Sequence, residues 1–256
     1  MPSALKLQEQ YGDALQVVFV ECQGSTRDQY EAFAWKMKWM GGRAMWTEER
    51  PFQTVGNGLP ETALVGVDGT ILMQGHPGNF GSKLEEALAA EIKKIKSPPE
   101  GTSAALKKAW GSFLKGDVAA ALEECDKLGT DEAKAAREEF VTRTQRRIAR
   151  AKWLVDEAYL VEAEAHLGQL AKDVKGATDL EPLVAAETAK LTEPARAGER
   201  EASKAYAAFA EQVAKKKPFD AANVKKAELL AEKHASTKSG ERAARFAALS
   251  KIKPAG

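Results

Sequence analysis

Two cysteines, Cys22 and Cys125, are the only thiols in this 256-residue chain and the first candidates for chemistry. A local dithiol redox centre needs two cysteines close together, usually as Cys-x-x-Cys, and no such motif occurs. The three histidines are scattered, so no Cys/His spacing suits a zinc ion. The glycine-rich phosphate loops and the Gly-x-Ser-x-Gly nucleophile motif are missing as well. The sequence therefore predicts no metal site and no bound cofactor.

Cys22 is the weak candidate for a reactive thiol. It follows the apolar run 17–20, and the carboxyl ends of strands face binding sites in open α/β sheets. Two readings stay open: an accessible or resolving thiol, or a small apolar residue that ends a strand. Cys125 shares a helical stripe with Leu122 and Leu128, so we expect it to be buried.

The first 97 residues alternate between strand-like and helix-like segments. The run 15–20 is β-branched and apolar, which is typical of a strand buried on both faces. Asp68-Gly69 lies between the apolar segments 63–67 and 70–73 and predicts a hairpin, because both turn positions tolerate positive φ. Helical spacing marks three further segments: 4–11, the residues after Ser25 or Thr26 up to Met37, and 82–95.

The segment 98–102, Pro-Pro-Glu-Gly-Thr, marks a domain boundary because two prolines cannot continue a helix. Beyond it, residues 103–256 are rich in alanine, lysine and glutamate and predict helices throughout. The expected helical segments are 103–115, 117–128, 131–171 with a possible break, 180–191, 195–214, 220–234 and 239–250.

An internal echo links two parts of the helical half. Trp110 and Phe113 precede a turn and an alanine-rich helix, and Tyr206 and Phe209 do the same. Such units usually stack as helical hairpins. The "FLKGD" turn at 113–117 is similar to that of tetratricopeptide hairpins. An irregular helical bundle is the alternative.

The first half resembles the thioredoxin-like superfamily, and more narrowly the TlpA/redoxin group of thiol–disulfide oxidoreductases. The segment 11–39 resembles that family's strand and following helix, and "GNGLPETALVGVDGTIL" (56–72) resembles its cis-proline loop and hairpin. "GHPG" (75–78) resembles the end of the last strand. The resemblance implies an incomplete α/β thioredoxin-like domain over 1–97, followed by an all-α helical-hairpin domain over 103–256.

The resemblance also implies where peptide would bind. Pro60 would be the cis-proline, and the backbone of Leu59 would meet an extended peptide; an ordinary trans-proline is the alternative. Glu61 stands where the family usually has threonine, which puts that contact in doubt. Trp35 and Trp39, four residues apart, would either form a docking patch or pack against the sheet.

The family's Cys-x-x-Cys would lie upstream of Met1, since residues 2–13 resemble the remainder of the active-site helix. Either the chain starts late relative to a longer protein, or the domain is a remnant without an active site; we favour the first. The family is periplasmic or secreted, but the first residues lack a signal peptide pattern.

We consider two hypotheses about function. In the first, the protein is related to thiol–disulfide oxidoreductases, and this chain lacks their catalytic cysteine pair. The other is a non-catalytic protein-binding scaffold that uses the cis-proline face and the helical hairpins. The net charge of +1 argues against nucleic acid, and no apolar run approaches the length of a membrane span. A protein or peptide partner is expected in either case.

Overall fold

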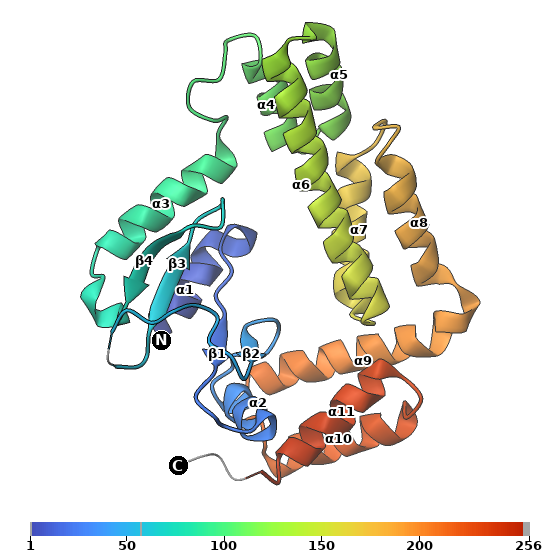
Figure 1. The fold of residues 1–256 in the computed structure, drawn as a ribbon. Coiled ribbons are helices and arrows are strands. Elements are labelled where there is room, and N and C mark those ends of the chain that lie inside the picture. The colour runs from blue at the N-terminus through green and yellow to red at the C-terminus, as the bar shows by residue number, and fades with distance from the viewer. Residues whose placement is uncertain (1, 57, 253–256) are drawn as a thin grey trace. The chain divides into compact units, whose positions relative to one another are not determined.

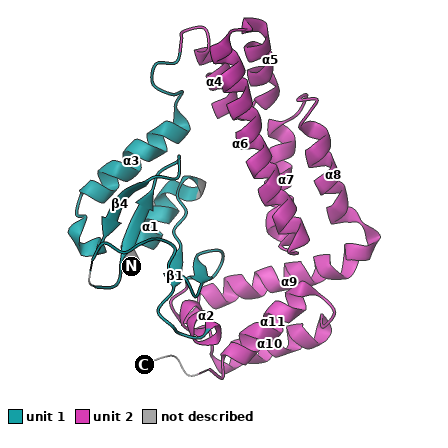
Figure 2. Ribbon diagram, viewed as in Figure 1, with its two compact units in different colours: residues 1–26, 39–102 teal, residues 27–38, 103–256 magenta. Residues whose placement is uncertain are grey.

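A computed structural model describes residues 2–56 and 58–252 (Figure 1). Internal contacts divide the chain into two units (Figure 2). Unit 1 comprises residues 1–26 and 39–102, and unit 2 comprises residues 27–38 and 103–256. Residues 27–38 therefore group with the C-terminal helices, although they lie within the first hundred residues.

Unit 1 combines two helices with four short strands. Its elements are α1 (Pro2–Tyr11), β1 (Phe19–Glu21), β2 (Ala44–Trp46), β3 (Thr62–Val65), β4 (Ile71–Gly75) and α3 (Lys83–Lys96), with the 3-10 turns η1 (Gly12–Ala14) and η2 (Pro77–Asn79). Unit 2 is helical: α2 (Arg27–Lys36), α4 (Lys107–Leu114), α5 (Val118–Leu128), α6 (Asp131–Asp156), α7 (Leu160–Asp173), α8 (Glu181–Thr192), η3 (Pro194–Arg196), α9 (Ala197–Ala214), α10 (Ala221–Lys233) and α11 (Lys238–Leu249).

The predicted thioredoxin-like α/β fold class is wrong. Helices dominate the described residues, and the strands form two separate two-stranded sheets instead of one central sheet. β1 pairs with β2 in parallel, and β3 pairs with β4 antiparallel. No ladder joins the segments 15–20 and 63–67.

The shortness of β1 has a local cause. The strand begins only at Phe19, and Val18 is 45% exposed, so this run is not buried on both faces. The backbone N–H of Val17 donates to the side chain of Gln8 in α1, at 3.0 Å, and not to a neighbouring strand. A β-branched run forms a long strand only where a partner supplies the ladder, and β1 has only the three-residue β2.

The predicted Asp-Gly hairpin is present between β3 and β4. Thr62 lies opposite Gly75 and Leu64 opposite Met73, with a bulge between Leu64 and Val65. Gly69 adopts a φ of 86°, a left-handed conformation that glycine takes without strain. Asp68 closes the turn by accepting from the Thr70 amide at 3.0 Å and its hydroxyl at 2.7 Å.

Trp35 and Trp39 do not share a helix face, because α2 ends at Lys36. Lys38 has a φ of 60°, which reverses the chain direction after the helix. In unit 2, Trp35 meets Phe246 edge to face, with ring centroids 4.8 Å apart. In unit 1, Trp39 stacks on Phe19 of β1 at 4.0 Å. Each ring is thus part of a packed core and not of a joint docking patch.

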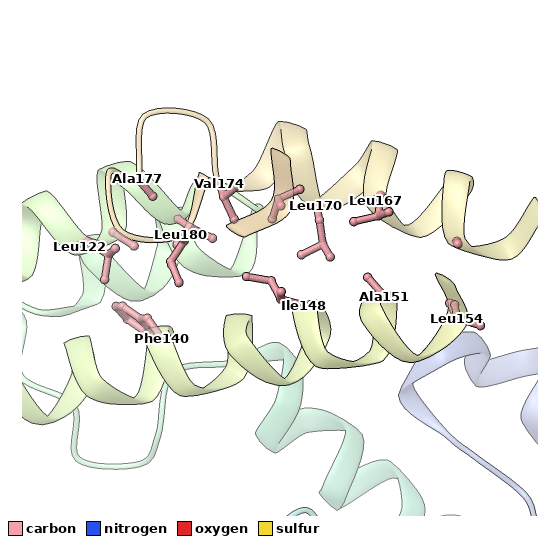
Figure 3. Packing of buried hydrophobic residues seen from close by; sticks show 14 of the residues in the cluster. Leu122, Phe140, Ile148, Ala151, Leu154, Leu167, Leu170, Val174, Ala177 and Leu180 are labelled. Atoms are coloured by element: carbon pink, nitrogen blue, oxygen red, sulfur yellow. The ribbon is translucent and has the colours of Figure 1, made fainter. Parts of the chain in front are cut away.

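The described part of the chain after residue 102 contains no strand, as predicted. The expected segment 131–171 is broken into α6 and α7, and Ala158 between them has a φ of 56°. Side chains at helical spacing along α6 build one apolar cluster with α4, α5, α7 and α8. Figure 3 shows Ile148 and Ala151 of α6 facing Leu167 and Leu170 of α7.

Polar side chains cap the first turns of four helices in unit 2. At the start of α5, Asp117 accepts a hydrogen bond from the Ala120 amide at 3.0 Å, and at the start of α10, Asp220 accepts one from the Asn223 amide at 2.7 Å. Thr130 caps α6 and Thr237 caps α11 in the same way. A side-chain oxygen at this position satisfies an amide that has no partner inside the helix.

The sequence echo covers the first two helices of two triplets, α4–α6 and α9–α11. In the first, Phe113 of α4 stacks on Phe140 of α6, with centroids 4.3 Å apart. In the second, Phe209 of α9 meets Phe246 of α11 at 5.0 Å. The first and third helices of each triplet are therefore joined by a phenylalanine pair.

Cationic side chains of η3 and α11 bind the carbonyls at the C-terminal end of α6. Arg196 donates to the Val155 carbonyl and Lys238 to the Asp156 carbonyl, both at 2.9 Å, while Arg242 donates to the carbonyls of Glu157 and Ala158. These carbonyls lie at the negative end of the helix dipole, so positive charge is favourable there.

Candidate peptide-binding site

The loop before β3 contains the residues that the resemblance singles out. The Leu59–Pro60 peptide bond is cis, the geometry expected for that loop. The side chains of Leu59 and Pro60 are both exposed. The loop therefore presents an apolar surface immediately before the hairpin.

Glu61 faces the protein and not the solvent. Its Oε1 accepts from the Val55 amide and from Nε2 of Gln74 in β4, both at 2.8 Å. Its Oε2 is buried and has no hydrogen-bond partner in the described residues. In this geometry Glu61 fixes the 53–61 loop against β4, which is a positioning role that the sequence did not indicate.

The hairpin itself carries an exposed apolar surface. Val65 of β3 lies opposite Ile71 of β4, and these side chains are 53% and 47% exposed. Val67 and Leu72 near the turn are exposed as well. No third strand joins β3 or β4 among the residues that the structure describes. Sequence reasoning identified the hairpin but missed this surface; its signal was an apolar hairpin without a third apolar strand beside it.

A carboxylate on α3 holds the turn of the hairpin in place. Glu91 Oε2 accepts from the Val67 amide at 3.0 Å, and Lys94 pairs with Glu91 Oε1. The hydrogen bond from Lys94, and then that from the Val67 amide, lower the pKa of Glu91 below its ordinary value of 4.5. The carboxylate is therefore charged at neutral pH and docks the hairpin on α3.

The two thiols lie in different kinds of surroundings. Cys22 directly follows β1 in unit 1 and is half-buried. Cys125 lies in the apolar cluster of unit 2, is 2% exposed, and has a pKa raised by burial. Both are free cysteines, and neither lies beside the Leu59–Pro60 loop in the chain.

Other kinds of site were sought over the same residues. Within 2–56 and 58–252, no group of three or more His, Cys, Asp or Glu side chains could hold a metal ion. None of the helices in those ranges is long and apolar enough to cross a bilayer.

Comparisons with known proteins return nothing for this chain: no family model, curated protein or solved structure matches it.

Proposed function

We propose that this protein is a non-catalytic protein-binding scaffold that takes an extended peptide segment along the β3–β4 hairpin. The observation that carries the proposal is the hairpin's exposed Val65–Ile71 pair in a sheet of only two strands. A strand edge without a neighbour offers backbone N–H and C=O groups to another chain, and apolar side chains on it favour association.

The geometry of the loop supports an extended ligand. A strand added to the hairpin would gain backbone hydrogen bonds along its length, and its alternate side chains would meet the valine and isoleucine. Leu59 and Pro60 extend the apolar surface where the chain enters β3. Glu61 and Glu91 tether the loop and the turn, so the surface is held in shape before a ligand arrives.

Thiol–disulfide exchange is not the activity that we propose for this chain. The redoxin reaction uses two neighbouring thiols, whereas Cys22 and Cys125 are both free and belong to different units, and Cys125 is buried with a raised pKa. A relationship to the redoxin group stays a prediction. Insulin reduction by dithiothreitol should run at its uncatalysed rate when the protein is added, and accelerated turnover would refute the non-catalytic part.

The binding proposal is tested with a synthetic peptide of alternating valine and threonine that carries lysine at both ends. Nuclear magnetic resonance of the ¹⁵N-labelled full chain should show saturable shifts in amides of the hairpin. A matched peptide that is N-methylated at every residue between the lysines lacks the N–H donors of both edges and should not bind.

Two variants separate strand addition from charge effects. Val65→Lys should weaken binding at least about tenfold, because a lysine on a strand edge blocks pairing. Glu85→Lys places a lysine on an exposed position of α3, changes the net charge by more than Val65→Lys does, and should leave binding unchanged. Absence of saturable shifts, or equal binding of the methylated peptide, would reject the proposal.

A further inference from the structure

Helix α2 docks on α11, although the two helices lie at opposite ends of the sequence. Both belong to unit 2, and α2 lies beside the α10–α11 pair (Figure 1). The residues that α2 and α11 bring together are 214 and 217 positions apart in the chain. The strands before and after α2, β1 and β2, belong to unit 1. α2 is thus a helix whose helical partners come from outside its own β-α-β segment.

The guanidinium group of Arg245 forms ion pairs with two carboxylates of α2. Nη2 of Arg245 donates to Oδ1 of Asp28 at 2.6 Å, and Nε donates to Oε2 of Glu31 at 2.8 Å. Arg27 pairs with the other oxygen of Glu31 at 2.6 Å. Arginine suits this role because its planar donors have a fixed geometry.

An aromatic contact lies one helical turn beyond the carboxylates. Trp35 packs edge to face on Phe246 and borders the cluster of buried residues formed by Phe209, Val213, Ala227, Phe246 and Ala247. Arg245 and Phe246 are adjacent on α11, so the charged and the aromatic contacts form one continuous surface.

The docking residues follow a simple helical pattern. Asp28, Glu31 and Trp35 stand at i, i+3 and i+7, which places them on one face of α2. The surface of α11 therefore recognises an amphipathic helix with two carboxylates about one turn apart and an aromatic residue one turn later.

The charged contact of α2 is partly exposed, whereas its residues Tyr30, Ala32 and Ala34 are buried. The side chains of Asp28 and Arg245 are 50% and 38% exposed and that of Glu31 is 15% exposed, so salt should weaken the Asp28–Arg245 pair more than the Glu31–Arg245 pair. α2 has ten residues, and helices of that length are marginal without docking. Gly24 before it and Lys38 and Gly41 after it have positive φ, so the chain turns sharply on both sides.

We propose that the Arg245–Phe246 surface of α11 is a binding site for an acidic amphipathic helix of a partner protein, and that α2 is its built-in competitor. A partner helix with the same spacing of two carboxylates and an aromatic residue displaces α2. This inference is independent of the peptide site on the hairpin, which lies in unit 1.

The test uses the full chain and a fluorescein-labelled peptide of residues 24–41 as the probe. Asp28→Lys combined with Glu31→Lys in the protein releases the internal competitor and leaves α11 intact. Fluorescence anisotropy should show that this variant binds the probe at least about tenfold more tightly than the wild type, which corresponds to about 1.4 kcal/mol. A probe with asparagine and glutamine in place of the two carboxylates should bind the same variant weakly.

Two further measurements make the result decisive. Adding Arg245→Glu to the double variant should abolish binding of the acidic probe, with the far-UV circular dichroism spectrum unchanged. In the wild type, excess unlabelled probe should raise hydrogen exchange in residues 27–36, since the probe displaces α2.

The proposal fails if the probe does not bind the double variant, or binds equally well with and without Arg245. It also fails if binding leaves exchange in α2 unchanged, because the probe would then occupy another surface. Dimerisation of the wild type that the double variant loses would show that a second copy, and not a partner, uses this surface.

Discussion

Units 1 and 2 fix their segments by different means. In unit 2, one apolar cluster joins α4 to α8, and a phenylalanine pair joins the outer helices of each triplet. In unit 1, single polar side chains fix backbone segments: Gln8 holds Val17, Glu61 holds Val55, and Glu91 holds Val67. Trp46 likewise donates to the Ser25 carbonyl at 2.8 Å.

The difference between the units shows how backbone groups are satisfied where no long strand ladder forms. Helices satisfy most of their own backbone groups, so unit 2 assembles chiefly through apolar faces, and polar side chains are needed mainly at the helix ends. The strands of unit 1 have three to five residues, and about half of its chain lies outside helices and strands. There the unpaired backbone groups take side-chain partners instead, because leaving them buried and unpaired is costly. Removing one contact should therefore destabilise all of unit 2, whereas in unit 1 it should loosen only the segment that the contact holds.

The largest effect is expected from Phe140→Ala in unit 2. Phe140 is fully buried and contacts both Trp110 and Phe113. Removing its ring should lower the free energy of unfolding by about 3–5 kcal/mol, measured by urea denaturation with circular dichroism. The matched control is Leu229→Ala, an apolar deletion at an exposed position of α10, which should change stability by less than about 0.5 kcal/mol. A loss below about 1 kcal/mol at Phe140 would show that the cluster is not the main support of unit 2.

A smaller loss is expected from Gly240→Ala at the start of α11. A Cβ there would lie 2.0 Å from the carbonyl oxygen of His234, which is backbone and cannot rotate away. The variant should lose about 3 kcal/mol, as overpacked sites do. Gly168→Ala provides the opposite control, because its Cβ would meet open space on α7 and should add about 0.5–1 kcal/mol. Equal stability of the two variants would contradict the close approach at the α10–α11 turn.

In unit 1, Glu61→Ala should have a local effect. The change removes the acceptor for the Val55 amide and for Gln74, and each lost hydrogen bond costs about 1 kcal/mol. Hydrogen exchange measured by mass spectrometry should accelerate in residues 53–61, while α6 and α7 keep their protection. Glu48→Ala, at an exposed position of the same unit, should leave both regions unchanged. Faster exchange across α6 and α7 in the Glu61 variant would break the contrast between the units.

The smallest effect is a pH dependence centred on Glu91. Its pKa is lowered in the folded protein, so the charged carboxylate stabilises the hairpin above the unfolded pKa of 4.5. That contribution disappears as the pH falls through the folded pKa, below 4.5. The Val67 amide resonance should follow this titration, and Glu91→Gln should abolish the pH dependence. Glu85→Gln on the exposed face of α3 serves as the control, and an unchanged titration in the Glu91 variant would refute the tether.

The sequence by itself determined the local features of this protein. Helical spacing located most of the helices after residue 102. Asp68-Gly69 determined the hairpin, and the loop at Leu59–Pro60 was identified with its cis bond. These signals suffice because helix bonds and turns involve residues only a few positions apart.

Only the tertiary structure decided which strands pair and which surfaces stay exposed. The run 15–20 reads as a buried strand, yet strand pairing depends on partners distant in sequence, and β1 finds only β2. The roles of Glu61 and the grouping of α2 with α11 depend on such distant contacts as well. The same reason explains the two tryptophans: their spacing predicts one helix face, but the turn at Lys38 sends Trp35 and Trp39 into different cores.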